Sequence, residues 1–239
     1  MSIWQKLGDV ADGGANAIAG LFEWAGGLVG GIGDSETRRQ VAFSVAMVAL
    51  SAKMAKADGI VTTDEVATFR RLFTVPAGEE RHVARLFELT KGDVAGFESY
   101  AFRVAAFYGG DCDGLEDVID GLFVIATADG AVHPAELAYL QRVGAILGIE
   151  GPAFERIAAR HVVPEEGDPY LILGVERSSE LSTIKQHYRK LAADNHPDRL
   201  IARGVPDEFI AIATERLAAI NGAWERIELE RLPGSPQPA

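Results

Sequence analysis

The chain has 239 residues, of which 48% are hydrophobic and 24% charged, a composition typical of globular proteins. Its formal net charge of −12 argues against a general nucleic-acid binder, because such proteins need an excess of cations to meet the phosphate backbone. The single cysteine, Cys112, excludes an intrachain disulfide and a zinc site built on several thiolates, and it favours a reducing compartment.

Residues 1–34 are predicted to form an arm rich in glycine and alanine. The only stretch apolar enough to suggest a membrane span, residues 13–33, carries Glu23 near its centre. A span needs about 20 mostly apolar residues, and a central acidic group costs about 2.5–3.5 kcal/mol. We therefore expect no span and no secretory signal here. Contact of residues 1–33 with a lipid surface, through their scattered apolar side chains, stays open.

Residues 35–162 show helical periodicity throughout. A first helix begins near Ser35 and ends before Gly59, where a glycine after the last turn is a common stop signal. No segment shows the alternation of a strand. The fold class is therefore predicted to be all-α, with further helices at about 78–90, 93–108, 115–127, 134–147 and 152–160.

A short sequence recurs within this region. Residues 57–61 (ADGIV) return as residues 128–132 (ADGAV), each between two predicted helices, which indicates two helix–turn–helix units. Pro134 is expected at the first helical position after the second turn, with His133 as the cap before it. With its two Asp-Gly turns, the region 35–162 resembles the TerB-like helical domain.

Four acidic residues near these two turns allow two interpretations. Helix caps and turn formation explain them fully, but paired carboxylates can also bind a hard divalent cation. Neither turn has the spacing of an EF-hand loop, so we favour caps and predict no metal and no cofactor. The residues are Asp58, Glu65, Asp129 and Glu136. An enzyme is not expected either, since Cys112 lies between two acids and the chain has no metalloprotease motif or Gly-rich phosphate loop.

A second domain is predicted at residues 163–232, after an acidic linker. Asp168 and Pro169 open a short helix, and Ser178 and Ser179 offer caps for a second one. The second helix ends at a predicted tight, exposed loop around Pro197, and a roomy loop leads to a third helix from about residue 206 to 229. Residues 233–239 read as a disordered tail. The second and third helices of this domain are thus expected to be long and antiparallel, with the loop around Pro197 between them.

Three spaced motifs identify this domain by resemblance. Residues 168–175 (DPYLILGV), 184–191 (IKQHYRKL) and 196–198 (HPD) are similar to the J domain of DnaJ-type co-chaperones. A TerB-like domain followed by a carboxy-terminal J domain resembles the DjlA-type proteins. The resemblance implies binding to a DnaK-type chaperone, a heat-shock 70 protein, through the loop and the basic face of the preceding helix. The implied chaperone-binding residues are His196, Pro197, Asp198, Lys185, Tyr188, Arg189, Lys190 and Arg199. Asp194 and Asn195 depart from the basic and aromatic residues of many relatives.

The predicted function is that of a bacterial stress-response co-chaperone that stimulates ATP hydrolysis by a DnaK-type chaperone and is not itself an enzyme. Its TerB-like domain would be an adaptor or a dimerisation module, so a homodimer is one option. The expected location is the cytoplasm, with attachment to the periphery of the inner membrane left open. The alternative is a TerB-like sensor of metal or membrane stress with a vestigial J domain.

Overall fold

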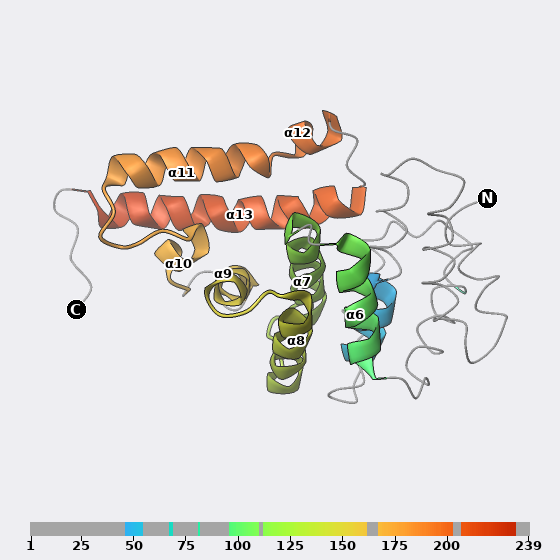
Figure 1. The fold of residues 1–239 in the computed structure, drawn as a ribbon. Coiled ribbons are helices and arrows are strands. Elements are labelled where there is room, and N and C mark those ends of the chain that lie inside the picture. Colours follow the sequence, from blue (N-terminus) through green and yellow to red (C-terminus); the bar gives the residue numbers. More distant parts are fainter. Residues whose placement is uncertain are drawn as a thin grey trace. The chain divides into compact units, whose positions relative to one another are not determined.

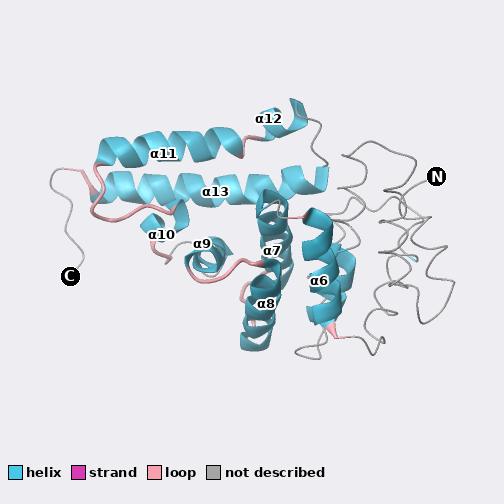
Figure 2. Ribbon diagram, viewed as in Figure 1, coloured by secondary structure: helices cyan, strands magenta, loops and turns pink. Residues whose placement is uncertain are grey.

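The structure is a computed structural model, and it describes residues 46–54, 67–68, 81, 96–109, 112–161, 167–202 and 207–232. Every regular element in these ranges is a helix, and no strand occurs among them (Figure 2). The all-α prediction is therefore confirmed. The predicted arm 1–34, the tail 233–239 and the first Asp-Gly turn lie outside the described residues.

The chain divides into two compact units, Met1–Ile149 and Glu150–Ala239. The first contains α6 (Phe97–Tyr108), α7 (Cys112–Ala126) and α8 (Pro134–Leu147), and each of these helices contacts the other two. Their ends agree with the predicted helices to within a few residues. The shared core is made of apolar side chains that are almost completely buried, among them Tyr100, Val104, Ile119, Leu122, Phe123, Leu140 and Val143.

The turn between α7 and α8 is fixed by local hydrogen bonds. Gly130 has φ of 103°, a conformation that favours glycine. His133 caps α8: its Nδ1 accepts from the backbone N–H of Ala135 at 3.2 Å, and its own N–H donates to Glu136 Oε2 at 2.9 Å. The predictions of His133 as a cap and Pro134 as the first helical residue are confirmed. Glu136 acts as the second partner of a capping box.

Tyr139 connects α8 to the helical segment 46–54. Its hydroxyl donates to the carbonyl of Leu50 at 2.8 Å, inside the core. Burial, and to a lesser extent the negative charge of Glu98, raises the pKa of Tyr139 well above 10.0. The folded state thus holds the phenol proton more tightly than the unfolded state does.

We expect Tyr139→Phe to lower the free energy of unfolding at pH 7 by about 1 kcal/mol, because one buried hydrogen bond is lost. Because the pKa is raised, the protonated Tyr139 stabilises the folded state. This contribution is fully present below pH 10 and is lost as the pH rises further. The variant should therefore lose less stability than the wild type between pH 9 and about pH 11. Urea unfolding at both pH values measures this, and an equal loss in the two proteins would contradict it.

The second unit is built on a helix hairpin. In it α11 (Leu181–Asp194) and α13 (Asp207–Glu230) run antiparallel side by side, joined through the short α12 (Pro197–Ala202), as Figure 1 shows. The small helix α10 (Pro169–Leu173) packs against α13. The predicted hairpin is thus confirmed, and Trp224 is one of its core residues. The core consists of Tyr170, Ile172, Leu173, Ile184, Ile220, Ala223, Trp224 and Ile227.

Helix α9 (Pro152–His161) belongs to this second unit, although the sequence pattern places the domain border after it. It contacts α10 and α13, and Ala159 packs against the core of the hairpin. The Arg156 side chain lies against Gly174, where a Cβ would come within 3.3 Å of Arg156 Cδ. Gly174 also has φ of 67°, so a glycine serves both the turn after α10 and the approach of α9.

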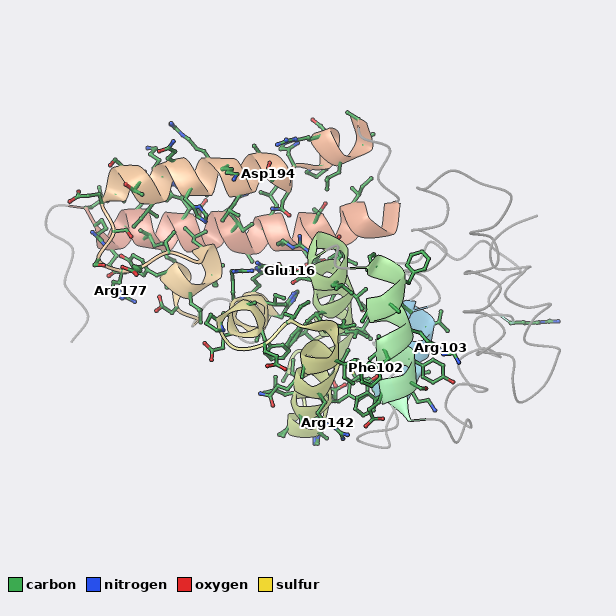
Figure 3. The ribbon with its side chains drawn as sticks, in the orientation of Figure 1. Phe102, Arg103, Glu116, Arg142, Arg177 and Asp194 are labelled. Carbon is green, nitrogen blue, oxygen red and sulfur yellow. The ribbon has the colours of Figure 1, made fainter. Side chains whose placement is uncertain are left out.

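Two arginines join the start of α10 to the end of α13. Arg177 binds Asp168 at 3.1 Å and Glu230 at 2.8 Å, and its guanidinium lies 4.3 Å from the centre of the Tyr170 ring (Figure 3 labels Arg177). Arg231 Nε donates to the Tyr170 hydroxyl at 3.0 Å. The open end of the hairpin is held by these contacts. Each exposed ion pair contributes only about 0–1 kcal/mol, so the cation–π contacts and the buried ring matter more.

Candidate chaperone-binding site

The basic face of α11 is formed by Lys185, Arg189 and Lys190, all of which are exposed. Lys185 is partly neutralised, because its Nζ lies 3.7 Å from Glu228 Oε1 and 5.5 Å from the centre of the Trp224 ring. Within the described residues, Arg189 and Lys190 have no ion pair. These two cations are therefore the part of the predicted face with the least internal compensation.

Tyr188 takes part in the packing of the hairpin. Its ring stacks on Trp224 with centroids 5.1 Å apart and planes 11° apart, and its hydroxyl donates to Asn221 Oδ1 at 3.1 Å. The side chain is half-buried. Tyr188 thus ties α11 to α13, and only the rest of its surface is open to a partner.

The His-Pro-Asp tripeptide begins a helix. His196 Nδ1 accepts from the backbone N–H of Asp198 at 3.2 Å, and the His196 carbonyl accepts from Arg199 and Leu200. Pro197 stands at the first helical position, where its lack of an N–H costs nothing. The roomy loop predicted between the tripeptide and the third helix is not found over residues 199–202, because the histidine cap and the proline start α12 directly, and α12 contacts α13.

This cap fixes the chemistry that His196 presents. Because Nδ1 is the acceptor, the neutral imidazole carries its proton on Nε2 and is a hydrogen-bond donor there. The Asp198 side chain is 88% exposed and its Oδ2 lies 3.8 Å from His196 Nδ1. Donor and carboxylate therefore stand next to each other on one turn of chain.

The same local geometry occurs at His133, before Pro134. There, too, Nδ1 accepts from the second residue after the histidine at 3.2 Å, and that residue is Ala135. A His-Pro cap is therefore not specific to a binding site. What distinguishes the tripeptide is its exposed carboxylate, Asp198, and the cations on the neighbouring α11.

An open groove of about 560 Å³ runs beside the tripeptide. Arg199 contributes to its lining and is held by Asp194 through a 2.6 Å ion pair, both side chains being about half exposed; Figure 3 labels Asp194 on α11. Apolar atoms from α11 and α13 contribute to the lining. The lining residues are Tyr188, Ala192, Ala193, His196, Asp198, Arg199, Leu217 and Asn221.

Other predicted positions are distributed differently. Asp58 and Glu65 lie outside the described residues, so the four-acid cation hypothesis is not tested. Asp129 Oδ1 accepts from Ala131 N–H at 3.5 Å, and Glu136 belongs to the α8 cap. In the described ranges, no group of three or more histidine, cysteine, aspartate or glutamate side chains is arranged to bind a metal. No helix in those ranges is long and apolar enough to cross a membrane.

Three residues shape the site in ways that the sequence did not predict: Asn195, noted only as a departure from many relatives, and Arg216 and Asn221, which were not noted at all. Asn195 and Arg216 bond to each other across α11 and α13, and Asn221 holds Tyr188. Of these three, only Asn195 has a local sequence signal for its role, since asparagine is common where a helix ends. The partners on α13 are far away in sequence, and no periodic pattern points to them.

The hairpin, the tripeptide at its turn and the basic face define a J-domain protein. Residues 168–228 match the DnaJ domain and residues 44–159 match the tellurite resistance protein TerB. The co-chaperone protein DjlA of Vibrio parahaemolyticus is 30% identical over 230 residues, which cover 83% of this chain and 81% of that protein.

Two further relatives support this match. The DjlA proteins of Vibrio cholerae (28% over 236 residues, 84% and 82% covered) and Photobacterium profundum (26% over 240 residues, 87% and 86% covered) are similar along most of their length. This chain belongs to the DjlA co-chaperone family. No solved structure matches it.

Proposed function

We propose that this protein stimulates ATP hydrolysis by a DnaK-type chaperone through its J domain, without catalysing a reaction itself. The TerB-like domain acts as an adaptor or as a dimerisation module that brings the J domain to its place of work. That place is the cytoplasm, including the periphery of the inner membrane. Membership of the DjlA family supports this proposal.

The observation that carries the proposal is the juxtaposition of two kinds of group on one hairpin. His196 and Asp198 offer a donor and a carboxylate at its turn, and Arg189 and Lys190 on α11 offer cations that have no ion pair in the described part of the chain. A partner with an acidic surface and one basic side chain would meet both. The groove beside the tripeptide leaves room for a side chain of that partner.

The small basic patch on α11 has to attract an acidic partner although the whole chain is acidic. The whole chain carries a net charge of −12, so it repels an acidic partner at long range. At physiological salt, charges farther apart than about 8 Å are largely screened, so a small basic patch decides the encounter. Arg189 and Lys190 therefore act on the rate of association with the partner, and they do not change the groups that the tripeptide presents.

The test is single-turnover ATP hydrolysis by a DnaK-type chaperone at increasing concentrations of the full chain. We expect a saturable rise in rate. The double variant Arg189→Ala/Lys190→Ala should raise the half-saturating concentration about tenfold at low salt, with a smaller effect at high salt.

Lys185→Ala is the matched control, because its ammonium group is already paired with Glu228. We expect an increase of only about twofold for this variant, as exposed pairs are worth about 0–1 kcal/mol. A folded wild-type chain that leaves the hydrolysis rate unchanged would overturn the proposal.

A further inference from the structure

Asn195, the residue just before the tripeptide, is held at three points. Its backbone N–H donates to the carbonyl of Leu191 at 3.1 Å, and its side-chain Nδ2 donates to the same carbonyl at 2.9 Å. Its Oδ1 accepts from Arg216 Nη1 on α13 at 3.2 Å. Both ends of the amide are thus used, one on α11 and one on α13.

This arrangement determines where His196 stands. The chain leaves α11 at Asn195, with φ of −99° and ψ of 10°, and the next residue is the cap of α12. The link to Arg216 fixes this exit relative to α13. The Asp194–Arg199 pair also spans the tripeptide, but its side chains are about half exposed, so solvent screens it.

We infer that Asn195 and Arg216 are positioning residues, which hold the His-Pro-Asp tripeptide in the one conformation that a DnaK-type chaperone binds. This inference rests on the proposed function. Both side chains are half-buried in the hairpin, and they act through the tripeptide rather than by contact with the partner. Losing the link lets the tripeptide sample other conformations, and the apparent affinity falls with the fraction that stays competent.

A double-mutant cycle in the full chain tests the pair. Asn195→Ala removes the amide, and Arg216→Met removes the guanidinium while it keeps an apolar stem. We expect each single variant to raise the half-saturating concentration about fivefold, because the competent fraction falls, while the maximal hydrolysis rate is unchanged. The double variant should be no weaker than either single one, because both remove the same link.

Three comparisons make the result specific. Thr214→Ala, which removes only a hydrogen bond within α13, should leave the half-saturating concentration unchanged. Asn195→Asp keeps an oxygen acceptor for Arg216 but loses the donor to the Leu191 carbonyl, so it should regain part of the affinity that Asn195→Ala loses. The thermal unfolding midpoint of each variant, followed by circular dichroism, separates loss of positioning from loss of folding, since an unfolded fraction would also raise the half-saturating concentration.

Other outcomes would overturn the inference. If Arg216→Met weakens binding equally in the presence and absence of Asn195, Arg216 acts through a contact other than Asn195, and the link between the two does not position the tripeptide. If wild type stimulates hydrolysis and Asn195→Ala does so at the same concentration, the inference fails while the proposed function stands. If wild type gives no stimulation, the proposed function itself fails, and the inference with it.

Discussion

Replacing Asp198 by asparagine is expected to abolish stimulation of the chaperone, with a loss of at least about thirtyfold in apparent affinity. A hydrogen-bonded charge pair that loses one partner at an interface costs about 2–5 kcal/mol. The Asp198 carboxylate is 88% exposed in the free protein and has only the His196 ring nearby. Asparagine keeps the size of the side chain and removes its charge. Single-turnover hydrolysis at several chain concentrations measures the effect.

Asp194→Asn is the matched control, since it removes one negative charge four residues earlier. Asp194 ends α11, where an acid opposes the helix dipole, and it holds Arg199 at 2.6 Å. We expect this variant to stimulate hydrolysis at an equal or lower half-saturating concentration, because Arg199 is released for the partner. Equal losses in the two variants would show that overall charge, and not the carboxylate beside His196, determines binding.

His196→Gln gives a second view of the same site. Glutamine lacks the imidazole ring, so the Nδ1 acceptor that caps α12 is lost and the amide donor is not held where the ring holds its Nε2. We expect stimulation to disappear while α11 and α13 keep their helicity, because neither helix depends on that cap. A far-ultraviolet circular dichroism spectrum close to that of wild type, together with the loss of stimulation, is the expected pair of results.

Trp224→Ala is expected to lower the free energy of unfolding of the second unit by about 3–5 kcal/mol, the range for a buried tryptophan truncated to alanine. The side chain is only 6% exposed. Its ring stacks on Tyr188 and lies near the Lys185 ammonium group, so α11 loses two contacts at once. Since folded domains are stable by only about 5–15 kcal/mol, stimulation should fall through unfolding at 37 °C. Urea unfolding followed by circular dichroism measures the change.

Leu229→Ala provides the control for Trp224 in the same helix. Leu229 is 62% exposed, so little apolar surface is buried there. We expect a change within about 0.5 kcal/mol, as is usual at exposed positions. A loss at Leu229 as large as at Trp224 would mean that the exposed end of α13 contributes to folding as much as its core does.

Local signals were sufficient for much of this molecule. His133 and Pro134 indicate the start of α8, and Gly148 indicates its end. Asp168 and Pro169 indicate the start of α10 in the same way, because each of these residues has a direct stereochemical role at a helix end. The tripeptide was recognised because its neighbours share the right spacing. Such features need only a few residues of context.

Other features depend on competition between neighbouring residues or on distant partners. Ser178 and Ser179 were expected to cap α11, yet Glu180 stands at the cap without a side-chain hydrogen bond, and Ser178 Oγ donates to Glu176 instead. Two serines in a row offer more than one position at which the helix can begin. The packing of Leu181 and Ile184 into the core decides which position is used. The Asn195–Arg216 link joins positions on different helices, so it becomes visible only once the hairpin is formed.

Helix α9 has a consequence for how such proteins are recombined. The match to TerB runs to residue 159, through most of α9, whereas α9 packs on α10 and α13 and supplies Ala159 to their core. Exchanging the carboxy-terminal part of this chain with that of a relative at residue 163 would therefore separate two surfaces adapted to each other, with Arg156 on one side and Gly174 on the other. A chimera cut between Ile149 and Glu150 transfers the hairpin together with the helix that covers it.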